Sequence, residues 1–191
     1  MKKSSFVLAM MILLSGSAVF AQKAEVNTQK SSIEWVGKKV GSQHNGNILL
    51  KSGYLELKDA EIVGGDFIVD MTSITNTDLK EDSKQKLVGH LKSDDFFGVQ
   101  TYPTAEFVVT KSSKFTDGTD GIATLTGDLT IKGKTENISF EVERAGNEFT
   151  AKLEIDRSKF DVRYGSDAFF DNLGDKAINN IFTLNIKLVI I

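Results

Sequence analysis

The sequence has no cysteine, one proline, one tryptophan and two histidines among its 191 residues. Without cysteine, the chain can form no disulfide framework and offers no attachment point for a lipid anchor on a cysteine. The two histidines, His44 and His90, lie in different segments, and no sequence spacing links them to a third metal ligand. We therefore expect no metal site, no cofactor, and a fold that depends on its hydrophobic core.

Positive charge is not in excess. The 23 Lys and Arg residues are outnumbered by 26 Asp and Glu residues, which gives a formal net charge of −3. Nucleic-acid binding takes much of its affinity from cationic side chains that contact phosphates. Adsorption to anionic membranes also depends on such side chains. We expect neither nucleic acid nor an anionic membrane surface as a partner.

A long hydrophobic stretch is lacking as well. The apolar run at residues 6–14 is nine residues long, whereas a membrane-spanning helix needs about 20. Lys2 and Lys3 precede this run and small residues follow it up to Ala21, a pattern typical of a secretory signal peptide. We expect cleavage after Ala21, a mature domain over residues 22–191, and a location in the periplasm or outside the cell rather than within a membrane.

Most of the remaining chain has the two-residue period of β-strands. The clearest example is residues 123–131, where apolar residues and a glycine alternate with threonine and aspartate. The same alternation occurs at residues 33–35, 53–57, 67–71, 107–109, 138–142, 149–155 and 182–190. Sixteen glycines and a single proline suit tight turns between antiparallel strands. The pattern predicts about eight strands, but it does not distinguish a closed barrel from two stacked sheets.

One segment has a helical period instead. Leu79, Leu87, Val88 and Leu91 fit one helical face among charged residues, which predicts a short helix over about residues 78–92. Thr77 or Asp78 is expected to cap its start. Two adjacent aromatic residues follow the helix, at positions 96 and 97, and we expect them to form a buried plug or lid.

Several ordered blocks carry a family resemblance. They are residues 35–38, 41–46, 67–74, 87–97, 102–107, 127–135 and 157–165. Through these blocks, residues 31–191 resemble the YceI-like family of lipocalin-like polyisoprenoid-binding proteins that bacteria export. The resemblance implies an all-β fold, an eight-stranded antiparallel β-barrel with one short helix, whose interior holds an isoprenoid-type lipid tail. Ligands of the family vary and include quinone-like and fatty-amide-like molecules.

A lipid tail requires large apolar side chains on one face of the sheet. Leu125, Leu129, Phe140, Leu153 and Phe182 are in phase, so closure would bring them into one lumen. Each CH₂ group removed from water contributes about 0.8 kcal/mol. The predicted ligand-binding residues are Phe67, Val69, Leu87, Leu91, Phe96, Phe97, Phe107, Leu125, Leu129, Phe140, Leu153, Phe160, Tyr164 and Phe182. Tyr164, His90 and His44 are candidates for contacts to a polar head group.

The leading hypothesis is an exported carrier or buffer that binds one polyprenyl or isoprenoid quinone-like lipid and is not an enzyme. A fatty amide or another long-chain lipid is the alternative ligand. A second hypothesis is an exported interaction module whose barrel is only a scaffold. A third is a hydrolase that uses Ser42 with His44, or Ser166 beside Asp167, although the sequence has no G-x-S-x-G elbow. A homodimer stays open, as does a lumen filled by its own side chains.

Overall fold

The computed structural model describes residues 21–59 and 61–191, so the signal peptide predicted up to Ala21 lies almost entirely outside the described residues. The strands are β1 (Gln22–Glu25), β2 (Ser32–Lys39), β3 (Ser42–Lys58), β4 (Glu61–Asp70), β5 (Thr104–Ser112), β6 (Gly121–Ile131), β7 (Lys134–Ala145), β8 (Glu148–Asp156) and β9 (Ile181–Val189). The helices are α1 (Glu81–Lys92) and the short 3₁₀ segments η1 (Met71–Ser73), η2 (Arg157–Phe160) and η3 (Gly174–Lys176).

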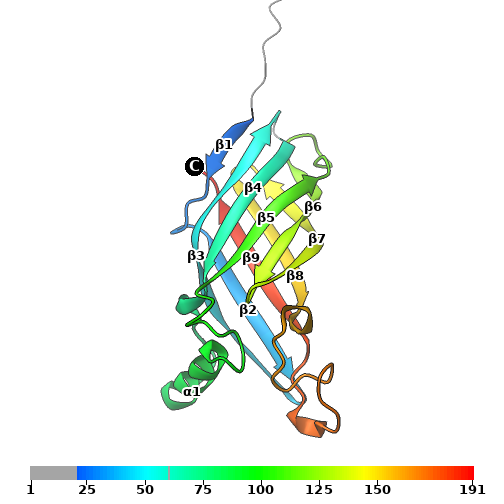
Figure 1. Cartoon of the computed structure of the whole chain (residues 1–191). Helices are drawn as coiled ribbons and strands as arrows, with labels where there is room; N and C mark the ends of the chain where they lie inside the picture. The colour runs from blue at the N-terminus through cyan, green and yellow to red at the C-terminus, as the bar shows by residue number, and fades with distance from the viewer. Residues whose placement is uncertain (1–20, 60) are drawn as a thin grey trace, which may run out of the picture.

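The sheet closes on itself. Strands β2, β9, β8, β7, β6, β5, β4 and β3 are antiparallel neighbours in that order, and β3 pairs back with β2 (Figure 1). β1 pairs with the far end of β3, and Val26 bridges to Ile190, so β1 and β2 together occupy one interrupted strand position. This arrangement confirms the predicted eight-stranded antiparallel barrel and excludes two open layers. Closure leaves no long unpaired sheet edge at the β2–β3 and β3–β4 boundaries.

An irregularity in β3 keeps both halves of this long strand facing the lumen. Ile48 and Leu50 are buried in its first half, and Gly53 and Leu55 in its second. A strict two-residue period cannot include both pairs. The register against β4 shifts between Leu50 and Ser52, and this bulge restores the inward phase.

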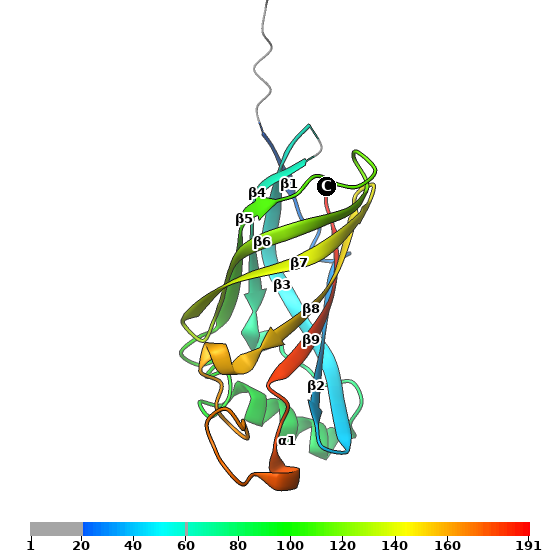
Figure 2. The same ribbon diagram turned by 90° about the vertical axis from the view of Figure 1, so that its right-hand side faces the viewer.

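The two ends of the barrel differ. In Figures 1 and 2, α1, the β2–β3 hairpin and the long loop between β8 and β9 lie at the lower end, while the C-terminus and the start of β1 lie at the upper end. None of the helices in the described part of the chain is long and apolar enough to cross a bilayer. "Lower" and "upper" are used below for these two ends.

The helix begins later than the sequence predicts. It starts at Glu81 with Lys80 as its N-cap residue, and no side chain caps it. The predicted cap at Thr77 or Asp78 is wrong because both side chains bind β3 instead: Thr77 Oγ1 accepts a hydrogen bond from Asn45 Nδ2, and Asp78 Oδ1 accepts one from the Asn45 N–H. The segment before the helix is therefore tied to the barrel wall.

A glycine in β3 makes this attachment possible. Gly46 lies opposite Trp35, whose Nε1 donates a hydrogen bond of 2.9 Å to the carbonyl of Thr75. The Thr75 N–H in turn donates to the carbonyl of Asn47 at 2.9 Å. A Cβ atom at Gly46 would lie 1.9 Å from the Thr75 oxygen, so any larger residue would displace the segment that follows η1.

We expect Gly46→Ala to lower the free energy of unfolding by about 1–3 kcal/mol, the usual cost of overpacking. Gly37→Ala in β2 is the matched control, because its Cβ would meet only a ring carbon of Trp35, at 3.9 Å. Urea unfolding followed by circular dichroism measures both. Equal stability of the two variants would contradict the close approach at Gly46.

Candidate functional site

The barrel lumen contains two apolar cavities, one above the other. The lower cavity has a volume of about 130 Å³ and the upper cavity about 100 Å³. Both are bounded by five side chains from different strands, which we call the waist. The waist consists of Ile33, Val69, Leu129, Ile155 and Leu184. The two cavities are thus parts of one bore that the waist narrows.

Aromatic rings shape the upper cavity. Phe107 lies between Phe67 and Phe140, with ring centroids 6.4 and 5.4 Å away, and all three line the cavity. Gly127 on the neighbouring strand gives Phe107 its space, since a Cβ there would lie 2.5 Å from the Phe107 Cζ. The wall carries one polar residue, Thr150. A cavity with such a lining favours hydrocarbon over water.

The lower cavity is covered by the segment after α1. Phe96 and Phe97 both line it, with their ring centroids 4.9 Å apart, and Phe97 also contacts Phe182 at 6.5 Å. Adjacent residues of a strand point to opposite faces, but these two lie in a turn and reach the same cavity. The predicted plug is therefore present. Trp35 forms part of the opposite wall.

A buried arginine stands at the lower end of this bore. Arg157 is 2% exposed and lines the lower cavity. Its Nε, Nη1 and Nη2 donate to the carbonyls of Asn179, Val162 and Ile178 at 3.1, 2.7 and 2.9 Å. Burial lowers the pKa of the guanidinium, while Asp156 and Asp167 act to raise it.

These hydrogen bonds leave part of the hydrogen-bond donor capacity of the guanidinium unused. An arginine has five N–H groups, and the contacts of Arg157 with the described residues use three of them. No carboxylate of the described chain forms an ion pair with it. The bore is therefore apolar along its length and cationic at its lower end.

Eleven of the fourteen predicted residues lie on the cavity walls. The upper cavity has Phe67, Val69, Phe107, Leu125, Leu129, Phe140 and Leu153, and the lower has Val69, Leu91, Phe96, Phe97, Leu129 and Phe182. Contact of these residues with a ligand stays a prediction.

The other three predicted residues lie outside both cavities. Leu87 is on α1 and packs from outside against the core, and Phe160 is buried in η2. Tyr164 is 49% exposed, with its ring 4.3 Å from that of His90, and it borders a surface groove instead of the lumen. Contact of these three residues with a ligand likewise stays a prediction. All three lie outside the strands, where the two-residue period gives no orientation.

The predicted ligand-binding set contains neither Arg157 nor Trp35, although both line the lower cavity. No pattern in the sequence marks Arg157, because an arginine after a strand is usually solvated. Trp35 shares the inward phase of Ile33, and that phase could have placed it in the lumen.

Two of the polar groups considered for catalysis, His44 and Ser166, are bound to structural partners. His44 Nδ1 donates to Asp78 Oδ2 at 2.8 Å, with both side chains 30% exposed. Ser166 is fully buried, and its Oγ accepts from the N–H of Ala168. The described residues contain no group of three His, Asp or Glu side chains that could hold a metal. His44 and Asp78 instead join the segment before α1 to the start of β3.

The model of the YceI-like domain family matches residues 25–190. The chain belongs to the YceI-like family. A UPF0312 protein of Vibrio parahaemolyticus is 32% identical over 117 residues, which cover 54% of this chain and 56% of that protein. The match thus spans little more than half of this relative.

Solved structures of YceI-like and related proteins have the same fold. BcnA of Burkholderia cenocepacia superposes with a TM-score of 0.66 at 23% identity, covering 86% of this chain and 98% of BcnA. A polyisoprenoid binding domain from Saccharophagus degradans gives 0.60 at 14% identity, covering 87% and 97%. The Campylobacter jejuni YCEI protein gives 0.53 at 19% identity, covering 100% and 99%.

The carboxylate of Asp78 makes a testable contribution to stability. Burial alone would raise its pKa, but hydrogen bonds from His44, the Asn45 N–H and Asn76 outweigh burial and lower the pKa to about 2. A carboxylate with a lowered folded-state pKa stabilises the fold above its unfolded-state pKa, near 3.8 here, and this contribution is lost as the pH falls through about 2.

We therefore expect Asp78→Asn to cost about 1–3 kcal/mol at neutral pH and to flatten the loss of stability below pH 4. Urea unfolding at several pH values between 2 and 7 measures both effects. Glu106→Gln, which removes an exposed carboxylate on β5, should keep the wild-type slope. An unchanged slope in Asp78→Asn would show that the carboxylate is not held in this way.

Proposed function

We propose that the protein binds the hydrocarbon tail of an isoprenoid-type lipid, polyprenyl or quinone-like, within the barrel lumen and carries or sequesters it unchanged. The observation that supports this most is the apolar bore with its two cavities and a buried arginine at its lower end. The polyisoprenoid binding domain of Saccharophagus degradans, whose fold is similar, adds support. We further propose that the protein is exported, as its N-terminal sequence predicts.

The energetics favour a tail over a small polar ligand. Each CH₂ group taken from water contributes about 0.8 kcal/mol, so ten carbons contribute roughly 8 kcal/mol before ordering costs. The upper cavity offers a tail one hydroxyl-bearing side chain, Thr150, in an otherwise apolar wall. Specificity for a sugar or a peptide would require several fixed polar partners. A hydrocarbon tail needs no fixed polar partners.

The size of the cavities constrains how the tail is held. Ligand pockets usually measure about 300–1,000 Å³, and the two cavities, about 130 and 100 Å³, are smaller even when taken together. A long chain must therefore part the waist and displace side chains such as Leu129 and Leu184. Loaded and empty protein should differ in side-chain packing at these positions.

Arg157 gives the bound lipid a direction. Its remaining N–H groups suit a head group with an oxygen acceptor, for example a quinone or an amide carbonyl. The head group would then lie in the lower cavity and the tail would extend through the waist into the upper one. His90, one of the head-group candidates, has a buried Nε2 without a partner among the described residues, but it does not line the bore.

Blocking the waist tests this function. Protein purified from its native host should yield a long-chain lipid on solvent extraction, and Leu129→Trp should reduce that yield by about tenfold or more because the larger side chain fills the bore. Val108→Trp is the matched control, since Val108 is exposed on the outer face of β5. Mass spectrometry of the extracts measures the lipid, and circular dichroism verifies folding.

The outcomes separate the alternatives. A fatty amide in the extract would support binding at the same site by a different class of ligand. Equal lipid in Leu129→Trp and wild type, or none in either, would contradict binding in the lumen. The interaction module would be favoured by two results together. Replacing exposed loop residues such as Phe169 and Phe170 would abolish biological function, and Leu129→Trp would keep it.

A further inference from the structure

The hydrogen-bonded pairing between β7 and β8, one seam of the barrel, is much shorter than either strand. β7 pairs with β6 along eleven positions and β8 pairs with β9 along nine. β7 and β8 pair with each other along only four, from Ala145 opposite Glu148 to Val142 opposite Ala151. All residues of β7 and β8 are described. Below Val142 and Ala151, each strand keeps its ladder on the far side but has no ladder partner on the other strand.

The open part of the seam has defined limits. Continuing the register would place Glu141 opposite Lys152 and Ser139 opposite Glu154, but these pairs are not formed. η2, which follows β8, packs against β7 and closes the lower limit. At about 3.4 Å per residue, the five unpaired positions from 141 to 137 span about 15 Å, and we call this stretch without ladder hydrogen bonds the slit.

The slit borders the upper cavity. Phe140 and Val142 from β7 line that cavity, and so do Ala151 and Leu153 from β8. The hydrocarbon-binding space therefore receives side chains from both sides of the slit. Because no ladder hydrogen bonds cross it, the two sides can separate without breaking any.

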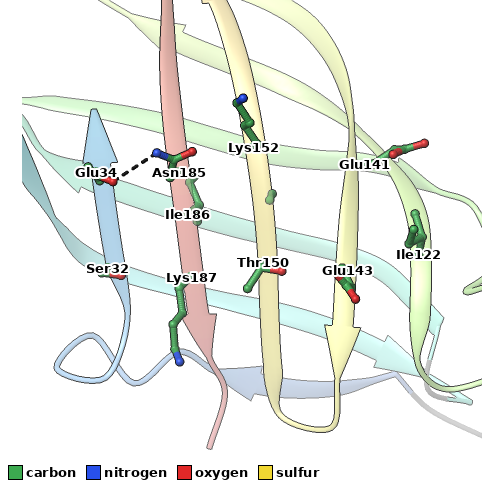
Figure 3. A pocket seen from close by; sticks show the side chains of 11 residues that line it. Ser32, Glu34, Ile122, Glu141, Glu143, Thr150, Lys152, Asn185, Ile186 and Lys187 are labelled. Carbon is green, nitrogen blue, oxygen red and sulfur yellow. Dashed lines mark hydrogen bonds between the residues drawn. The ribbon is translucent and has the colours of Figure 1, made fainter. Parts of the chain in front are cut away.

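A groove lies on the outside of the same wall. It has a volume of about 510 Å³ and includes Glu141 and Lys152, the first two residues that fail to pair. Thr150 projects from β8 beside Glu143 of β7, and Lys152 lies further along β8 (Figure 3). Thr150, Ala151 and Ile186 line both this groove and the upper cavity, so the wall between them is one residue thick.

Aromatic rings in contact with an arginine lie at both ends of the barrel. At the upper end, Phe115 and Phe149 are buried with centroids 6.4 Å apart, and the guanidinium of Arg144 lies over both. At the lower end, the guanidinium of Arg157 lies 5.4 Å from the Phe96 ring. Access through either end would disturb these contacts, and access through another seam would break ladder bonds worth about 1 kcal/mol each.

We propose that the β7–β8 slit is the lateral entrance through which a hydrocarbon chain passes between the outer groove and the upper cavity. This inference rests on the proposed function. The head group passes first, toward Arg157 below the waist, and the tail follows between strands whose charged rim, Glu141 and Lys152, stays hydrated outside. Phe140 and Leu153 receive the tail inside, and the aromatic contacts at both ends of the barrel stay in place during the exchange.

Locking the slit tests the entrance. The chain has no cysteine, so Glu141→Cys with Lys152→Cys introduces a single thiol pair, closed by oxidation or by a short bifunctional maleimide. The control, Thr124→Cys with Glu141→Cys, shares one position and spans the β6–β7 seam, where these residues already pair. Trp35, the one tryptophan of the chain, lines the lower cavity and reports its occupancy by fluorescence.

The probe is geranylgeraniol delivered from phosphatidylcholine vesicles, and uptake is followed by stopped-flow fluorescence. Locking the β7–β8 pair should slow uptake by about tenfold or more relative to the same variant with free thiols. Locking the β6–β7 control should leave the rate unchanged. If the locked and free-thiol forms of both variants take up the lipid at the same rate, the proposed entrance is wrong, while lipid binding itself is unaffected. Absence of binding in every form would overturn the proposed function and the entrance with it.

Discussion

The closure of eight strands into a barrel is the constraint on which the rest of this structure depends. Such a barrel has an interior just wide enough for its own inward side chains. Every feature of the lumen follows from how that narrow space is divided. Where glycine stands on the wall, as at Gly127, a neighbouring aromatic ring can turn into the space. Where large aliphatic residues meet, at the waist, the bore is almost filled.

The sequence predicts which strand residues face the lumen better than it predicts that the sheet closes into a barrel. A two-residue period assigns a face to each residue of a strand, and Leu125, Leu129 and Leu153 lie in the lumen as that phase requires. The period is the same in a sandwich, and the family resemblance supplied the choice of a barrel. The bulge after Leu50 has no sequence signal of its own beyond a break in the period.

Polar positions were the least predictable part of the site. Whether a charged side chain is solvated or buried depends on loops distant in sequence, and Arg157 is buried only because the loop ending at Asn179 folds back over it. Asp78 shows the same limit. Its position before a helix favours capping, yet three partners on β3 and the adjoining loop compete successfully for its carboxylate. Local propensity is overruled wherever tertiary partners offer more hydrogen bonds.

The β7–β8 pairing ends where large inward side chains would meet across the seam. Where the two strands pair, the inward residues meeting across the seam include Val142 and the small Ala151. The next inward positions are Phe140 and Leu153, and Phe140 is drawn toward Phe107 on β5. Size alone does not part the strands, because Phe67 and Phe107 face each other across the paired β4–β5 seam. What distinguishes the β7–β8 seam is η2, which follows β8 and packs against β7 below the unpaired stretch. An unpaired stretch beside a nearly filled lumen lets the barrel expand around a guest without loss of ladder hydrogen bonds.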